Sequence, residues 1–148
     1  RDPDGAVRTA RLSIRLAYVY GAAMITLYVF GAPALVEFFS SGFSEHPGET
    51  ERLAVLLLRL AAIYVLADST QLVFSGALRG AGDTAWVMRF SIVVHWVLAG
   101  AAFLLIRVIA ADPVVVWTVF IAVIITLGVA MYLRWRSGAW RRIKLIEV

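Results

Sequence analysis

The chain has 148 residues, of which 61% are hydrophobic, and its mean hydropathy is +0.84. Soluble domains use about 45–50% apolar residues, and the excess here lies in four long runs, so the composition excludes an ordinary soluble domain and indicates an all-α polytopic membrane protein. The chain has no cysteine, which excludes disulfides and thiolate metal sites, and its net charge of +4 comes from basic residues that flank the apolar runs, so we expect no nucleic-acid partner.

The first 15 residues are polar and basic. Asp2-Pro3-Asp4-Gly5 contains turn-forming residues, and the arginines that follow recur at helical spacing. For residues 1–15 we predict a cytoplasmic loop and a helix lead-in at the membrane surface. The sequence begins with Arg1 and has no charged-then-apolar signal segment. We therefore expect it to be an internal part of a longer protein, with an upstream part missing.

Four segments are predicted to cross the membrane, at about residues 16–36, 53–78, 85–106 and 113–133. The first and the last each contain 21 uncharged residues, which form about 31 Å of helix and can cross a hydrocarbon core of about 30 Å. Gly21 offers a surface for close helix packing, and Gly31 with Pro33 predicts a kink or a helix end. The tail, residues 134–148, is basic and contains two tryptophans, which is typical of an interfacial segment.

The chain has two histidines, and each is a candidate functional residue. His46 lies in a polar segment, residues 37–51, which has four glutamates and no lysine or arginine. Its spacing from these acids fits no metal-ligand pattern, so we favour a solvated histidine in an external loop. His95 lies in the middle of the third span. It could relay protons, but we favour a neutral side chain bonded to a neighbouring helix.

The second span carries a carboxylate, Asp68, about two-thirds of the way along it. A carboxylate at that depth costs at least ~2.5 kcal/mol to insert and marks a candidate functional site. Tyr64, Gln71 and Ser75 share its stripe of the helix at helical spacing. Such a stripe should face the bundle interior or a water-filled cavity. We therefore take Asp68 as the candidate functional residue of this span, with the other three in support.

A glycine-rich turn, ALRGAGDT, follows the same helix. Gly80 and Gly82 permit positive φ and a tight reversal. Arg79 suits a helix C-terminus, where the dipole favours a cation. Asp83 or Thr84 is expected to cap the next helix.

The basic residues are distributed unequally between the two ends of the spans. With four spans, the N-terminal segment, the turn and the tail lie on one side of the membrane. That side holds eleven basic residues, namely Arg1, Arg8, Arg11, Arg15, Arg79, Arg89, Arg134, Arg136, Arg141, Arg142 and Lys144. The other side holds three, namely Arg52, Arg59 and Arg107. By the positive-inside rule, both ends of the chain are predicted to be cytoplasmic.

The central run, IYVLADSTQLVFSGALRGAGDT, resembles the signature of the multidrug and toxic compound extrusion (MATE) transporters, in which a helix with a buried aspartate leads into this type of turn. The matching residues are Asp68, Gln71, Ser75, Gly76, Ala77, Leu78, Arg79, Gly80, Gly82, Asp83 and Thr84. The N-terminal RDPDGAVRTARLSIR is similar to the loop after the family's eighth helix, and SGAWRRIKLIE is similar to its C-terminal end. Departures include the lack of a proline near Ala101 and Val115 in a region where glycine is common.

The resemblance implies that the chain forms helices nine to twelve of a twelve-helix antiporter with two six-helix lobes. It also implies export of cationic or amphipathic drugs across a bacterial or archaeal cell membrane in exchange for Na⁺ or H⁺, without a cofactor. Asp68 would then belong to a cation site in the C-terminal lobe, and its acidic partner on the seventh helix is absent from this sequence. The implied partners are the lipid bilayer, the N-terminal lobe with helices seven and eight, and a small organic cation.

Three alternatives differ in class. A lipid-linked precursor flippase of the same superfamily should line its cavity with several basic residues, whereas the spans offer only Arg59. A non-transporting membrane scaffold is compatible with four helices, because these alone cannot form a pathway between two lobes. An intramembrane enzyme is disfavoured, since no Ser–His–Asp or His–Glu–x–x–His arrangement occurs.

Overall fold

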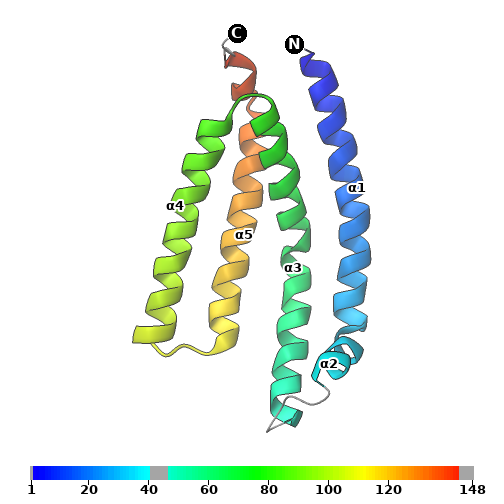
Figure 1. Cartoon of the computed structure of the whole chain (residues 1–148), viewed down its shortest axis with the longest axis vertical. Coiled ribbons are helices and arrows are strands. Elements are labelled where there is room, and N and C mark those ends of the chain that lie inside the picture. The colour runs from blue at the N-terminus through cyan, green and yellow to red at the C-terminus, as the bar shows by residue number, and fades with distance from the viewer. Residues whose placement is uncertain (1, 41–46, 144–148) are drawn as a thin grey trace.

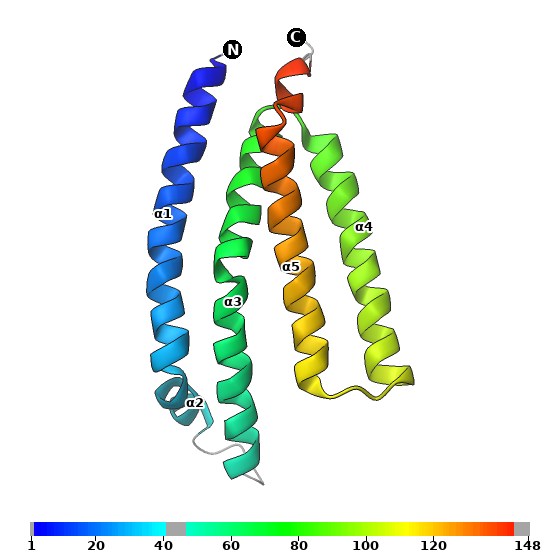
Figure 2. The same cartoon turned by 180° about the vertical axis from the view of Figure 1, so that it is seen from behind.

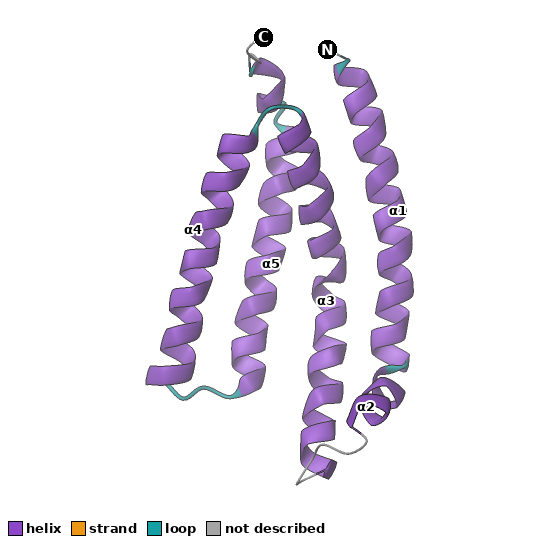
Figure 3. Ribbon diagram, viewed as in Figure 1, coloured by secondary structure: helices purple, strands orange, loops and turns teal. Residues whose placement is uncertain are grey.

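The computed structural model describes residues 2–40 and 47–143, and within them the chain forms helices and no strand (Figure 3). The five α-helices are α1 (Pro3–Phe30), α2 (Ala32–Ser40), α3 (Pro47–Gly80), α4 (Thr84–Phe103) and α5 (Pro113–Arg136). A π-helical segment, Leu104–Val108, continues α4, and a 3₁₀ turn, Ala139–Arg142, follows α5.

The long helices run side by side, with α3 between α1 and α5 and with α4 beside α5 (Figure 1). One end of the bundle, which we call the terminal end, holds the beginning of α1, the α3–α4 turn and the 3₁₀ turn. The view from behind shows the same grouping, with α2 and the α4–α5 connection at the opposite end (Figure 2). The three basic segments that were expected to share one side of the membrane therefore do lie together.

Four helices are long and apolar enough to cross a membrane. They cover Pro3–Phe30, Gly48–Gly80, Thr84–Val108 and Pro113–Arg136, with mean hydropathies of 1.4, 1.8, 2.0 and 2.7. Each contains most of one predicted span. The prediction of an all-α polytopic membrane protein is thus confirmed.

The first helix begins earlier than the predicted span. The residues predicted to form a turn are instead its N-terminus. The Asp2 carboxylate accepts a hydrogen bond from the Gly5 backbone N–H at 2.8 Å, and Pro3 occupies the first helical position. Proline fits there because its missing N–H has no partner in that turn. The lead-in is therefore continuous with the span, and α1 has 28 residues.

The acidic segment is shorter than expected. Residues 37–40 belong to α2 and residues 47–51 to α3, so the predicted loop over 37–51 is wrong at both ends. His46 lies outside the described residues. The predicted break near Pro33 is confirmed, since α1 ends at Phe30, Gly31 caps it, and α2 turns away from its axis (Figure 1).

The helices pack closely where glycine permits it. A Cβ atom on Gly128 of α5 would lie 2.5 Å from the backbone oxygen of Ala67 in α3, and one on Gly21 of α1 would lie 3.1 Å from Leu66 Cδ2. A side chain on Gly128 would require α3 and α5 to move apart, whereas one on Gly21 would require only that the Leu66 side chain shift. The main apolar core lies at the terminal end and consists of Phe74, Leu78, Val87, Leu127, Met131 and Trp140.

Candidate cation site and glycine-rich turn

Asp68 lies deep within the span formed by α3. It is 12 residues before the end of the helix at Gly80, which is about 18 Å along the axis at 1.5 Å per residue. The hydrocarbon core is about 30 Å thick. The carboxylate therefore lies well inside the part of α3 that is long and apolar enough to cross a membrane.

The two neighbours of Asp68 show which side of α3 it occupies. Ala67 contacts α5 at Gly128, and Ser69 lies near Gly21 of α1. Since successive helical residues are separated by about 100°, Asp68 lies on the face of α3 between these two contacts. Its side chain is half-buried, and within the described chain it forms no hydrogen bond or ion pair.

The cation nearest in sequence within the span is engaged elsewhere. The Arg59 guanidinium donates from Nε to the backbone oxygen of Val29 in α1 at 3.3 Å. It lies nine residues from Asp68, about 14 Å along the helix. The described part of the chain thus leaves the Asp68 carboxylate without a positively charged partner.

The predicted polar stripe occupies one face of α3, but its members have different partners. Tyr64 makes edge contacts with Phe120 and Trp117 of α5, with ring centroids 6.0 and 6.5 Å away, and it lies near enough to Asp68 for an electrostatic interaction. Ser75 is 1% exposed and bonds within its own helix. Gln71 is half-buried. The four residues share a face without forming one hydrogen-bond network.

The turn after α3 has the hydrogen bonds of a Schellman motif. The N–H of Asp83 bonds to the oxygen of Leu78 at 2.8 Å, and the N–H of Gly82 bonds to the oxygen of Arg79 at 3.0 Å. Gly82 has φ +95°, the conformation that this motif requires and that glycine adopts without strain. Gly80, which we had also expected to allow positive φ, remains helical, and nothing in the described chain contacts the place of a Cβ there.

Two further residues of the motif, Arg79 and Leu78, stabilise the end of α3. Arg79 donates from Nε to the backbone oxygen of Ser75 at 3.2 Å and from Nη2 to the Ser75 hydroxyl at 3.1 Å. It lies in the last turn of α3, near the negative end of the helix dipole, as predicted. Leu78 is fully buried in the apolar core.

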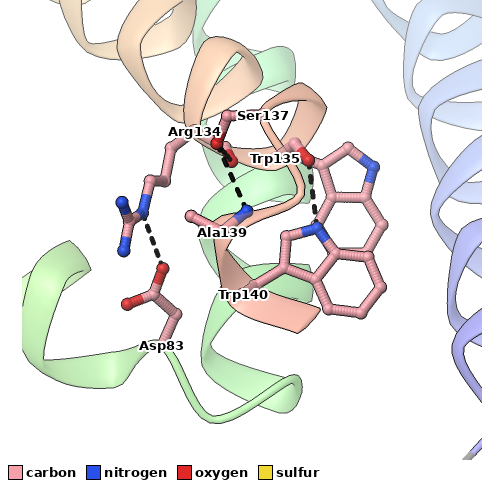
Figure 4. Close-up of polar contacts among 6 residues, drawn as sticks. All are labelled: Asp83, Arg134, Trp135, Ser137, Ala139 and Trp140. Carbon is pink, nitrogen blue, oxygen red and sulfur yellow. Dashed lines mark hydrogen bonds and ion pairs between the residues drawn. The ribbon is translucent and has the colours of Figure 1, made fainter. Parts of the chain in front are cut away.

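Asp83 has a different role from the predicted one. It occupies the N-cap position of α4, but its carboxylate makes no capping hydrogen bond there. Instead, it accepts a hydrogen bond from Arg134 Nε of α5 at 2.8 Å, and the Asp83 side chain is only 5% exposed (Figure 4). The Arg134 guanidinium also lies over the Trp86 ring, 5.0 Å from its centroid. Thr84 is the first residue of α4.

Sequence reasoning missed these partners of the turn. Arg134 was counted only among the basic residues of the tail. Trp140, another residue of the tail, is 5% exposed, stacks on Trp135 with centroids 4.4 Å apart, and donates from its indole N–H to the Trp135 backbone oxygen at 3.0 Å (Figure 4). The tail is thus folded onto the bundle up to Ile143, the last residue that the structure describes. The sequence indicated these contacts only through the aromatic and basic residues that cluster after the turn and in the tail.

His95 is bonded to its own helix rather than to a neighbour. Its Nδ1 lies 2.7 Å from the backbone oxygen of Ser91, and the side chain is exposed within this chain. The ring nitrogen at that position must carry the hydrogen, because a carbonyl oxygen can only accept. This differs from the expected bond to a neighbouring helix.

These features define an integral membrane protein with a carboxylate inside one span and a tightly bonded glycine turn after it. The MatE family model matches residues 1–104 of the chain. The chain belongs to this family, the multidrug and toxic compound extrusion (MATE) transporters, whose members in general are not enzymes.

One curated relative has the name "Probable multidrug resistance protein NorM" and comes from Rhodopseudomonas palustris. It is 35% identical to this chain over 97 residues, which cover 66% of the chain and 20% of the relative. The matched part of the chain therefore spans about one fifth of the length of that protein. No solved structure matches the chain.

Proposed function

We propose that this chain is part of a secondary antiporter that exports cationic or amphipathic compounds in exchange for Na⁺ or H⁺. Asp68 is proposed to be its cation-coupling residue. The observation that carries the proposal is a carboxylate near the middle of a span to which the described chain offers no hydrogen bond and no counter-ion. Family membership and the similarity to a probable multidrug resistance protein support the substrate class.

The coupling is electrostatic in this proposal. An ionised carboxylate in the membrane interior is unfavourable. A cation or a proton that binds Asp68 therefore lowers the free energy of the conformation in which Asp68 is accessible to it. A substrate cation that competes for the same negative charge then binds more weakly, and the two ligands are exchanged. By linkage, each ligand must weaken the binding of the other by the same factor.

The moving unit is proposed to include α3, α4 and α5. The Asp83–Arg134 ion pair joins the α3–α4 turn to α5, and Gly128 places α5 directly against α3. The turn itself is therefore not the hinge in this proposal. The three helices move together against the rest of the transporter, as the rocking lobes of secondary transporters do.

The remainder of the protein completes the proposed site. We propose that the chain supplies helices nine to twelve of the C-terminal lobe, and that an acidic residue on the seventh helix shares the cation with Asp68. The terminal end is proposed to be cytoplasmic, since eleven of the fourteen basic residues belong to its segments. Residues 1–15 and 134–148 then lie at the cytoplasmic surface of a prokaryotic cell membrane.

The experiment uses the complete protein that contains this chain, reconstituted in vesicles, and measures efflux of a fluorescent organic cation under an imposed Na⁺ or H⁺ gradient. We expect gradient-driven efflux in the wild type and its loss in Asp68→Asn, which keeps the size of the side chain and removes its charge. Glu49→Gln is the matched control, because Glu49 is an exposed carboxylate in the first turn of the same helix. Unchanged gradient dependence in Asp68→Asn would overturn the proposal, and loss in both variants would show that the effect is not specific to the site.

A further inference from the structure

A pocket opens at the terminal end, on the side of α3 that lies between α1 and α5. It has a volume of about 520 Å³. Val7 and Ile14 of α1 and Phe74 of α3 contribute apolar walls, and Tyr132 and Trp135 of α5 contribute aromatic ones. Phe74 lies about 120° around α3 from Asp68, so this pocket is separate from the proposed coupling site.

Three arginines from three different segments line the same pocket. Arg11 comes from α1, Arg136 from the end of α5 and Arg141 from the 3₁₀ turn. No carboxylate lines the pocket, and in the described part of the chain none of the three forms an ion pair. Asp2 lines a neighbouring pocket together with Arg141, again without an ion pair between them.

Two other arginines at this end are bonded to protein groups. Arg79 is bonded to Ser75, and Arg134 to Asp83. The arginines that converge on the pocket therefore carry charge that the described chain does not neutralise. Such a cluster attracts an anion, and guanidinium groups match phosphate oxygens with paired hydrogen bonds.

The tail holds its arginine in place. Trp140 is buried and stacked on Trp135, and the Arg141 guanidinium lies over the Trp140 ring, 5.2 Å from its centroid. The N–H of Arg141 also bonds to the oxygen of Gly138 at 3.0 Å, in a turn where Gly138 has φ +69°. The cation is thus ordered before any ligand binds, which lowers the entropy lost on binding.

The pocket has the polarity of a site at a membrane surface. Its charged groups come from the segments at the terminal end, while aromatic and aliphatic side chains form its walls. Tyrosine and tryptophan typically lie at the level of the lipid headgroups, and basic pockets between membrane helices bind anionic headgroups. A soluble anion would use the arginines but would leave the apolar walls without a ligand.

We propose that this pocket binds the phosphate headgroup of an anionic phospholipid, with Arg11, Arg136 and Arg141 on the phosphate and with the acyl chains against Phe74 and Ile14. The lipid is a resident ligand rather than cargo, because the pocket lies on a different side of α3 from Asp68. By bridging α1, α5 and the tail, it would fasten α1 to the unit formed by α3, α4 and α5.

The test uses the complete protein in detergent, incubated with phosphatidylglycerol or with phosphatidylcholine of the same acyl chains, and measures bound lipid by native mass spectrometry. The pocket variant is Arg11→Gln/Arg136→Gln/Arg141→Gln. The matched control, Arg8→Gln/Arg15→Gln/Arg142→Gln, removes the same charge at the same end from exposed arginines that do not line the pocket. Both are compared with the wild type.

We expect the wild type to retain phosphatidylglycerol in preference to phosphatidylcholine. Each single substitution in the pocket should weaken binding about fivefold, as expected for one basic residue at an anionic lipid surface, and the pocket variant should weaken it at least tenfold. The control should change it by less than about threefold. If the pocket variant does not fold, the single variants Arg136→Gln and Arg141→Gln give the same comparison, since both side chains are exposed.

Three results would overturn the proposal. Equal losses in the pocket and control variants would mean that the lipid responds only to the overall charge of this end. Complete competition by inorganic phosphate would identify a site for a soluble anion. No preference for phosphatidylglycerol in the wild type would mean that another segment of the protein fills the pocket.

Discussion

The ion pair between Asp83 and Arg134 should be a main determinant of the stability of the terminal end. Removal of one partner of a fully buried pair costs about 3–5 kcal/mol, because the other charge remains buried and unpaired. Here the Asp83 side chain is 5% exposed, but that of Arg134 is 28% exposed, so the remaining guanidinium can be partly solvated. For Asp83→Ala we therefore expect a smaller loss, about 2 kcal/mol in the free energy of unfolding.

The substitution is a clean test of the ion pair, because the Asp83 side chain makes no capping hydrogen bond that would be lost with it. The assay is a double-mutant cycle with Arg134→Met, which keeps apolar bulk in place of the guanidinium. The free energy of unfolding of the complete protein is measured by titration with a denaturing detergent. We expect a coupling energy of about 1–2 kcal/mol between the two sites.

Arg136 provides the control for this cycle. It lies two residues after Arg134 but forms no ion pair with Asp83, so Arg136→Met should be additive with Asp83→Ala. The reasoning is refuted if Asp83→Ala and Arg134→Met are also additive within about 0.3 kcal/mol. The pair would then be a contact without energetic importance, and the turn would be free to move relative to α5.

Two further predictions concern backbone conformation and helix contact. Gly82→Ala places a side chain at φ +95° and should lower the free energy of unfolding by about 1 kcal/mol, whereas Ala110→Gly, at φ +52°, should raise it by a similar amount. The same detergent titration measures both. Changes of the same sign in the two variants would contradict the assigned conformations. Gly128→Ala brings a Cβ to 2.5 Å from the Ala67 oxygen and should cost about 1–3 kcal/mol through forced separation of α3 and α5. An unchanged free energy of unfolding in Gly128→Ala would contradict the close contact of these helices.

The number and approximate positions of the spans could be predicted because they depend on local properties of the sequence. A run of about twenty apolar residues must form a helix in a membrane, where backbone groups have no other partners. The use of Gly82 and Arg79 at the end of α3 followed from the same kind of local rule. The break after Phe30 was equally local, since Gly31 and Pro33 both disfavour a continuous helix.

The local predictions were wrong where the same residue type is favourable in two kinds of structure. Asp, Pro and Gly form turns, but they also form good helix starts, and the structure uses Asp2 and Pro3 for the second purpose. Asp83 could have capped α4 by the same rule that Asp112 follows at α5, where it accepts a hydrogen bond from the Val114 N–H. Its carboxylate binds Arg134 instead, and no local pattern reveals a partner 51 residues away.

The candidate site was predictable only in part, for a related reason. The depth of Asp68 follows from counting residues along a span. Its surroundings depend on how α1 and α5 pack against α3, which the glycine contacts at Gly21 and Gly128 determine. The convergence of Arg11, Arg136 and Arg141 on one pocket likewise required the fold of the tail.

The central claim is that Asp68 couples the movement of a cation to that of the substrate. The most direct measurement loads vesicles that contain the complete protein, imposes a substrate gradient alone, and follows the opposite movement of radiolabelled sodium or of protons reported by a pH-sensitive dye. Our account predicts that the substrate gradient drives one of these cations in the wild type and neither in Asp68→Asn. Cation movement that persists in Asp68→Asn at the wild-type rate would contradict the account and would place the coupling residue elsewhere in the transporter.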